Sequence, residues 1–242
     1  MSDAMLAVEN MSAWYGAAQI LYGLSFEVGR GEVVALMGRN GAGKSTTMKS
    51  IMGLLDERDG RVRFNSADIS RLRPYEIARR GIGFTPEDRR IFDDLTVLEN
   101  LDIGRQAPRA FADGTPAPDW TPERLFAMFP NLAEMPNRLG GRMSGGEQQM
   151  LTVARTLMGN PLLVLLDEPS EGVAPLIVEQ MANTIIELKK EGLSILLSEQ
   201  NVHFARLVSD RVYVLEKGQI RWHGSMAELA DNQDVQRTYL TV

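Results

Sequence analysis

The sequence contains no cysteine and only two histidines, His203 and His223. Without cysteine the chain can form neither a disulfide framework nor a thiolate metal site, which fits a reducing compartment. The N-terminal sequence MSDAMLAVEN lacks the charged-then-apolar pattern of an export signal. The apolar runs at 33–37 and 162–166 have the length of strands and fall short of the roughly 20 residues that a membrane-spanning helix needs. We therefore expect a cytoplasmic chain that does not itself cross a membrane.

An excess of positive charge is also missing. The 26 lysines and arginines are outnumbered by 32 acidic residues, which gives a net charge of -6. General binding to nucleic acid relies on clustered lysine and arginine, so we expect no nucleic-acid partner. Local basic clusters at 71–73 and 89–90 are interpreted as solvated surface. With 242 residues, 44% of them hydrophobic, the chain can bury a sizeable core.

Three short apolar runs, at 33–37, 162–166 and 194–197, have the pattern of buried parallel strands. The first is followed by apolar residues at helical spacing from Met48 to Leu55. After the second, a helix is expected to begin at Pro175 and to end at Gly192. Strands that alternate with helices predict an α/β fold with a mainly parallel sheet.

The flanks of this core show a different pattern. Glycine-containing turns at 29–31 and 216–219 lie between strand-like stretches and predict antiparallel hairpins beside the parallel sheet. From residue 87 to residue 159 the strand signals disappear, which indicates an inserted helical lobe.

That lobe is expected to hold a proline-rich loop at 107–118 and helices near 122–129 and 144–158. We predict a single domain over 1–242, with a core lobe made of 1–86 and 160–242 and a helical lobe at 87–159.

A phosphate-binding loop is predicted between the first apolar strand and its helix. Its sequence is Gly38-Arg39-Asn40-Gly41-Ala42-Gly43-Lys44-Ser45-Thr46. The glycines allow backbone N–H groups to surround a β-phosphate, and the helix N-terminus adds partial positive charge. Lys44 is expected to reach the β- and γ-phosphate oxygens, and Ser45 to offer a hydroxyl to Mg²⁺.

The second apolar strand delivers two adjacent carboxylates, Asp167 and Glu168, at its carboxyl end. Ligands of open α/β sheets bind at this edge. We expect Asp167 to hold Mg²⁺ and Glu168 to orient and polarise the attacking water as the catalytic base.

A third segment, Met143-Ser144-Gly145-Gly146-Glu147-Gln148-Gln149, opens a helix and has two interpretations. Ser144 and Glu147 have the spacing of a capping box, which by itself starts a helix well. Two consecutive glycines are costly in a first helical turn unless some group approaches the backbone closely. An anion bound at exposed N–H groups would explain them.

These three segments, in this order, make the chain resemble the ATPases of ABC transporters over almost its entire length. The resemblance implies a P-loop NTPase core and a head-to-tail dimer, in which Ser144–Gln148 meets the γ-phosphate of ATP held by the other subunit. It also implies that Tyr15 stacks on adenine and that the loop 170–175 crosses to the partner. The nucleotide-binding residues expected from it are Tyr15, Gly38, Asn40, Gly41, Gly43, Lys44, Ser45, Thr46, Ser144, Gly145, Gly146 and Glu147.

Two positions depart from the family pattern. Glu87 stands where most members have a glutamine, and we expect it beside Ser45 and Asp167 as a metal ligand. Gln200 stands in place of the switch histidine. Its amide can donate to a γ-phosphate but cannot become cationic near neutral pH. We therefore expect Lys44, Glu168 and Gln200 to be the catalytic residues, with Glu168 as the base.

The segments 86–92, 143–150 and 198–201 resemble one of the two ATPases of branched-chain amino-acid importers. This implies an ATP- and Mg²⁺-dependent subunit on the cytoplasmic face of the inner membrane. Its expected partners are transmembrane permease subunits, a second ABC ATPase and, indirectly, a periplasmic substrate-binding protein. Importers of urea, amides or aromatic acids, and non-transport ABC ATPases, remain alternatives. An ordinary P-loop kinase or GTPase would leave Ser144–Gly146 unexplained.

Overall fold

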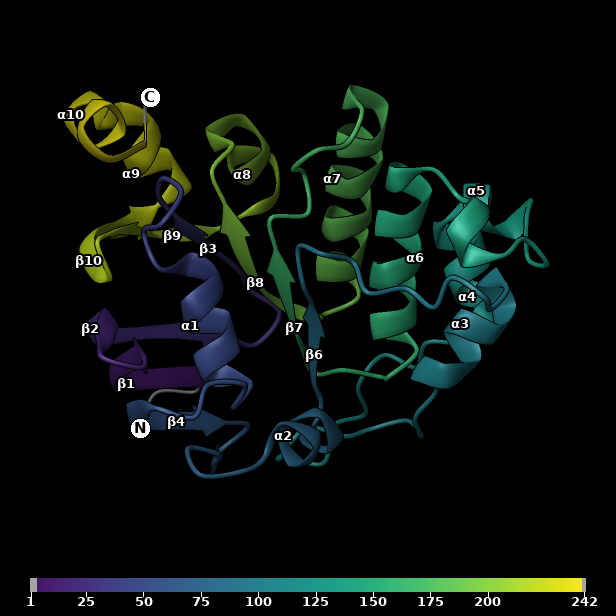
Figure 1. The fold of residues 1–242 in the computed structure, drawn as a ribbon, viewed down its shortest axis with the longest axis horizontal. Coiled ribbons are helices and arrows are strands. Elements are labelled where there is room, and N and C mark those ends of the chain that lie inside the picture. Colours follow the sequence, from purple (N-terminus) through teal and green to yellow (C-terminus); the bar gives the residue numbers. More distant parts are fainter. Residues whose placement is uncertain (1–3, 241–242) are drawn as a thin grey trace.

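The computed structural model describes residues 4–240, which form two sheets covered by helices (Figure 1). The first sheet is antiparallel throughout and has the order β2-β1-β4-β5. Its strands are β1 (Ala4–Tyr15), β2 (Ala18–Gly29), β4 (Arg58–Phe64) and β5 (Ala67–Asp68).

The second sheet has the order β10-β9-β3-β8-β7-β6, and only its edge strand β10 is antiparallel to its neighbour. Its strands are β3 (Val33–Met37), β6 (Ile82–Thr85), β7 (Leu163–Asp167), β8 (Ser194–Glu199), β9 (Arg211–Glu216) and β10 (Gln219–Ser225). Every residue of β3, β7 and β8 is buried, which explains why these strands are apolar apart from a few polar residues near the ends of β7 and β8.

Helices follow the strands as the sequence predicts. They are α1 (Lys44–Ile51), α2 (Pro74–Arg80), α3 (Val97–Gly104), α4 (Pro122–Met128), α5 (Pro130–Ala133), α6 (Gly145–Leu157), α7 (Pro175–Lys190), α8 (Val202–Val208), α9 (Met226–Asp231) and α10 (Gln233–Val235), with a 3-10 turn at Gly140–Arg142 and a π-helical turn at Gln236–Leu240. Pro175 is the first residue of α7, and Gly192 adopts a left-handed φ of 85° just beyond its end. The α/β fold with a mainly parallel sheet and an antiparallel flank is confirmed.

The prediction of a hairpin at residues 29–31 is wrong. This turn connects β2 of the antiparallel sheet to β3 of the mainly parallel sheet, and β2 pairs instead with β1. The Glu32 carboxylate accepts from the N–H of Gly29 at 2.7 Å, and the N–H of Gly31 donates to the hydroxyl of Ser194 at 2.9 Å. These bonds turn the chain from one sheet into the other. The second turn, at 216–219, does join an antiparallel pair, β9 and β10.

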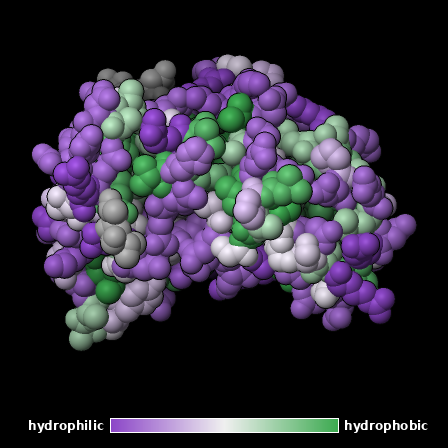
Figure 2. Space-filling model, turned by 90° about the horizontal axis from the view of Figure 1, so that it is seen from above, coloured by the Kyte–Doolittle hydropathy of each residue, from purple (hydrophilic) through white to green (hydrophobic). Residues whose placement is uncertain are grey.

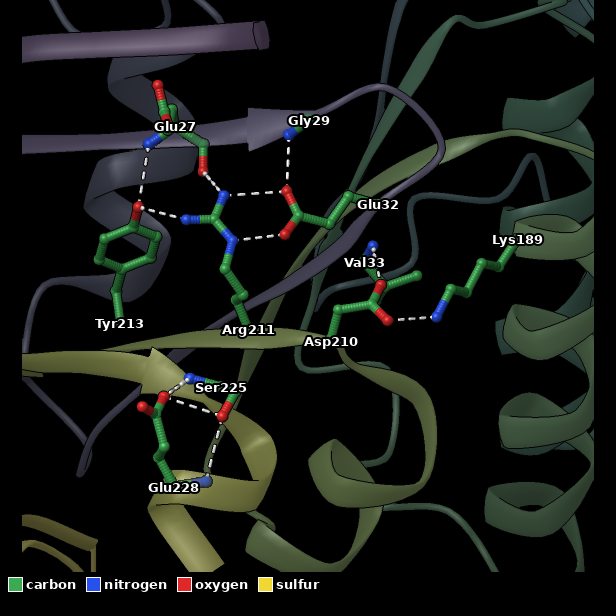
Figure 3. Close-up of polar contacts among 10 residues, drawn as sticks. All are labelled: Glu27, Gly29, Glu32, Val33, Lys189, Asp210, Arg211, Tyr213, Ser225 and Glu228. Carbon is green, nitrogen blue, oxygen red and sulfur yellow. Dashed lines mark hydrogen bonds and ion pairs between the residues drawn. The ribbon is translucent and has the colours of Figure 1, made fainter. Parts of the chain in front are cut away.

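A polar network centred on Arg211 fastens the two sheets together (Figure 3). The guanidinium of Arg211, on β9, forms a bidentate ion pair with Glu32 and donates to the carbonyl of Glu27 on β2 at 3.2 Å. The hydroxyl of Tyr213 accepts from the N–H of Glu27 at 3.3 Å. The hydrogen bond to Glu32 raises the pKa of Arg211 above its ordinary value despite partial burial.

Helices α3 to α6 form the lobe on the right of Figure 1, beside the edge strand β6. The core of this lobe includes Trp120, Phe129 and Leu157, and it is continuous with the packing of α7 on the sheet. The proline-rich loop at 107–118 is not part of this core. Its Phe111 packs into the core between the two sheets instead. No helix between residues 4 and 240 is long and apolar enough to span a bilayer.

The carboxyl ends of β6, β7 and β8 and the N-termini of α1, α6 and α7 lie on the same side of the molecule (Figure 1). Seen from this side, the surface is mostly hydrophilic with separate hydrophobic groups, and its outline is hollowed along one edge (Figure 2). The predicted functional segments therefore share one face.

Candidate functional site

The phosphate-binding loop connects β3 to α1, as predicted. Gly41 and Gly43 adopt left-handed φ angles of 77° and 107°, and a Cβ added to Gly43 would lie 2.8 Å from a methyl carbon of Leu21. A side chain at Gly43 would be both strained and obstructed. Asn40 is exposed, and Thr46 is half-buried in the first turn of α1.

Lys44 lies inside this loop, and the residue is 4% exposed. Its Nζ donates to the carbonyl of Gly38 at 2.8 Å and forms an ion pair with Oε1 of Glu168 at 3.0 Å. Two of the three predicted catalytic side chains, Lys44 and Glu168, are therefore in direct contact. A phosphate bound in the loop would compete with Glu168 for Lys44.

Glu168 has an unusual backbone, with a left-handed φ of 49° directly after β7. Its N–H donates to the carbonyl of Ser198 on β8 at 3.0 Å, which fixes this turn. Burial raises the pKa of Glu168, but hydrogen bonds with Glu171 and Gln200 and the charge of Lys44 outweigh it and hold the pKa below its usual value. Glu168 is therefore an ionised carboxylate, as a base requires.

Asp167 and Ser45 form the other contact between the two segments, with Ser45 Oγ donating to Asp167 Oδ1 at 3.0 Å. Burial raises the pKa of Asp167, and the hydroxyl of Ser45 offsets only part of this effect. A carboxylate and a hydroxyl so arranged fit Mg²⁺, which favours one or two carboxylates together with substrate phosphates. Between residues 4 and 240, no group of three or more histidine, cysteine or acidic side chains is placed to hold a metal ion.

Glu87 is exposed in the turn after β6. Its charge is close enough to add to the raised pKa of Asp167 and of Glu171. Its role as a metal ligand stays a prediction.

Gln200 reaches Glu168 from the end of β8. Its Nε2 donates to Glu168 Oε2 at 2.7 Å and to Glu171 Oε2 at 3.3 Å. The structure therefore brings Lys44, Glu168 and Gln200 together as predicted. The hydrogen bond with Glu168, followed by partial burial, raises the pKa of Glu171 to about 7.

The segment that begins α6 confirms one of the two interpretations of its sequence, the capping box. Ser144 and Glu147 do form a capping box, with Ser144 N–H donating to Glu147 Oε2 at 2.6 Å. A Cβ at Gly146 would lie 2.6 Å from Ile177 at the start of α7, and one at Gly145 would lie 2.8 Å from the guanidinium of Arg89. The packing of Ile177 and Arg89 is thus a second reason for the two glycines, besides a bound anion.

Tyr15 ends β1 and is 48% exposed, so its ring is available for stacking. The histidines take no part in the site: His203 is exposed on α8, and the ring of His223 lies 5.6 Å from that of Tyr213.

The sequence analysis missed Glu199, the last residue of β8. This carboxylate is 2% exposed and accepts from the backbone N–H groups of Gln200 and Asn201, each at 2.9 Å. It also accepts from the hydroxyl and the N–H of Ser170, in the loop after Glu168. Burial raises its pKa, which these hydrogen bonds partly counter. An acidic residue at the end of a buried strand was the available signal, the same signal that identified Asp167.

Known proteins match the chain over nearly its whole length. A family model described as ABC transporter matches residues 21–171. The high-affinity branched-chain amino acid transport ATP-binding protein BraG of Pseudomonas aeruginosa is 41% identical over 236 residues, which are 98% of this chain and 99% of BraG. The lipopolysaccharide export system ATP-binding protein LptB of Haemophilus influenzae is 34% identical over 245 residues, covering 98% and 97% of the two chains.

A solved structure agrees with these matches. The crystal structure of a nucleotide-free ATP-binding cassette from an ABC transporter superposes with a TM-score of 0.80 and 31% identity, over 96% of this chain and 95% of that one. Together with the contacts of Lys44, Asp167 and Glu168, these similarities show that the chain belongs to the ABC transporter ATP-binding family and is an ATPase of the P-loop class.

Proposed function

We propose that the chain is the ATP-hydrolysing subunit of an importer for branched-chain or other hydrophobic amino acids. The pairing of Lys44 and Ser45, at the start of α1, with Glu168 and Asp167, at the carboxyl end of β7, is the observation that carries the ATPase activity. The 41% identity to BraG over almost both full lengths supports the cargo class.

ATP binding would draw Lys44 from Glu168 to the phosphates. Ser45 and Asp167, with Glu87 as a third candidate ligand, would hold Mg²⁺, which when bound neutralises phosphate charge. Glu168 would then be free to accept a proton from the attacking water. Gln200, which already donates to Glu168, would orient that water or the γ-phosphate.

Two copies of this chain, or this chain with a related ATPase, would enclose ATP between them in a head-to-tail dimer. In one chain the contacts of Lys44 and Ser45 are with the core lobe, whereas Ser144, Gly145 and Gly146 lie at the start of α6 in the helical lobe. Both segments face the same side of the molecule. A phosphate held by both would join two chains, and its cleavage would release them.

A groove of about 420 Å³ between the core lobe and the helical lobe offers a contact for a permease subunit. Its apolar lining includes Met52, Phe84, Phe92 and Ile103, of which the last two are 47% and 53% exposed, and Arg79, Arg90 and Arg155 line it as well. Exposed apolar side chains in a groove suit a helix that lays its apolar face there. This contact would place the chain on the cytoplasmic face of the inner membrane, with a periplasmic binding protein acting only through the permease.

Urea, amides or aromatic acids are the alternative cargo. A role in export is less well supported, because the identity to LptB is 34%, lower than the 41% identity to BraG. The test is uptake of labelled leucine, urea and benzoate by cells whose only copy of the gene encodes Lys44→Ala. We expect leucine uptake to be lost and the other two to persist. Loss of urea or benzoate uptake alone would reassign the cargo, and recovery of the tagged chain on ribosomes in place of membrane proteins would refute the transport role.

A further inference from the structure

The turn after β6 is held in an unusual conformation by α6. Arg89 and Arg90 are consecutive residues with left-handed φ angles of 60° and 50°, a region that residues other than glycine seldom adopt. The hydroxyl of Thr152 donates to the carbonyl of Arg89 at 3.0 Å, and the guanidinium of Arg155 donates to the carbonyl of Arg90 at 2.6 Å. Two side chains of α6 thus stabilise a turn that would otherwise be strained.

This turn directs the side chain of Arg89 to the first turn of α6. Its Nε donates to Gln149 Oε1 at 3.2 Å, and its Nη1 would lie 2.8 Å from a Cβ at Gly145. Within residues 4–240 its two terminal nitrogens have no hydrogen-bond acceptor. The neighbouring Arg90, by contrast, is paired with Asp88 at 2.8 Å. Arg89 therefore presents two terminal guanidinium nitrogens, without an acceptor among the described residues, beside the helix N-terminus.

The backbone at this helix end is only partly satisfied. The capping box uses the N–H groups of Ser144 and Glu147. The N–H groups of Gly145 and Gly146 donate to no acceptor among the residues that the structure describes. In the proposed dimer these two amides face the γ-phosphate of the ATP bound by the partner.

Resting on that proposed function, we propose that Arg89 is a further phosphate-binding residue, which contacts the γ-phosphate of the ATP held by the partner's phosphate loop. A guanidinium matches two phosphate oxygens through parallel hydrogen bonds and adds a full positive charge, which backbone amides lack. Its contact is made across the dimer interface and needs the γ-phosphate, so it favours association with ATP over association with ADP.

The test uses the full chain with Glu168→Gln, in which slow hydrolysis preserves ATP. Sedimentation with Mg²⁺ and ATP measures the dimer dissociation constant. Loss of a charge-assisted hydrogen bond costs about 10- to 100-fold, and the Arg89→Ala dimer loses one at each of its two sites. We therefore expect Arg89→Ala to raise the dimer dissociation constant about 10²- to 10⁴-fold, and Arg89→Lys to restore part of the loss. Binding of ATP to dilute monomer should be unchanged.

Two control variants distinguish a contact of Arg89 with phosphate from a purely structural role of Arg89 in the turn. Arg90→Ala removes an equal charge next to Arg89 and should change the dimer constant less than about threefold. Gln149→Ala removes the side chain that holds Arg89 in place and leaves the guanidinium itself. It should raise the dimer dissociation constant clearly less than Arg89→Ala does. Equal losses in Gln149→Ala and Arg89→Ala would overturn the proposal in favour of a structural role.

Mixing tests the direction of the contact. When a Lys44→Ala chain and an Arg89→Ala chain pair, one of the two sites combines an intact Lys44 with an intact Arg89 from different chains. We expect the mixture to associate at ATP concentrations at which neither variant does alone. No gain on mixing would overturn the contact across the interface. Failure of the parent Glu168→Gln chain to dimerise with ATP would instead refute the proposed dimer itself.

Discussion

The ion pair between Lys44 and Glu168 predicts that Glu168→Gln changes more than the rate of hydrolysis. Both side chains are nearly buried, at 3% and 7% exposure, and their charged atoms are 3.0 Å apart. At an effective dielectric constant of about 20, this distance corresponds to a gross attraction of about 5 kcal/mol. Removing one partner of a buried pair leaves the other charge poorly compensated, at a typical cost of about 3 to 5 kcal/mol.

We expect the nucleotide-free variant to lose about 3 kcal/mol of its unfolding free energy, at the low end of that range because Lys44 keeps its hydrogen bond to Gly38. Nucleotide binding should respond in the opposite direction. In the wild type a phosphate must displace Glu168 from Lys44, whereas in the variant it need not. The affinity for ADP should therefore rise about tenfold or more. This corresponds to about 1.4 kcal/mol or more of additional binding free energy, because the phosphate now compensates the charge of Lys44.

Urea denaturation without nucleotide and calorimetric titration with ADP measure the two quantities separately. Glu187→Gln is the matched control, since it makes the same chemical change in the exposed pair with Lys190. This control should change the unfolding free energy by less than about 0.5 kcal/mol. If Glu168→Gln left both stability and ADP affinity unchanged, the ion pair would not exist in solution and this reasoning would be refuted.

The other predictions concern the same strand ends. Steady-state hydrolysis should fall by roughly 10² to 10⁴ in Glu168→Gln and by less in Gln200→Ala, and the reverse order would make Gln200 the main catalytic side chain. Glu199→Gln should lower the unfolding free energy by about 2 kcal/mol, because a charged acceptor of several hydrogen bonds is lost; unchanged denaturation midpoints would contradict this. Glu171 has a pKa raised to about 7 in the folded chain from an ordinary value of 4.5, so its stabilising contribution is complete below pH 4.5 and is lost as the pH rises through 7. Thermal unfolding across this window should therefore show a weaker loss of stability in Glu171→Gln than in the wild type, and parallel curves would exclude the shift.

The sequence was most informative where a residue pattern is typical of one structural role and seldom occurs in another. The glycines around Lys44 and the acidic end of the strand 162–166 predicted a loop and a strand end, and the structure places these two segments side by side. Patterns of buried strands also predicted the parallel sheet, because strands covered on both faces must be apolar throughout.

Prediction failed where the outcome depended on tertiary pairing. The turn at 29–31 has the sequence of a hairpin, yet β2 pairs with β1, and local sequence does not reveal which strand is the neighbour. Arg89 was interpreted as solvated surface because a run of arginines does not disclose its backbone angles or the helix packed against it. Glu199 was not predicted because local sequence does not reveal that the N–H groups of Gln200, Asn201 and Ser170 donate to its carboxylate.

The Arg211 network has a mechanical consequence for the nucleotide site. It fastens β2 to β9, so the sheet that carries Tyr15 and the sheet that carries Lys44 are linked by an ion pair in addition to the chain itself. A displacement of the helical lobe would therefore leave the spacing between these two side chains unaltered. If Tyr15 stacks on adenine as the sequence predicts, the two linked sheets would hold both ends of the nucleotide. Any movement during turnover would then be a movement of the helical lobe that carries Ser144.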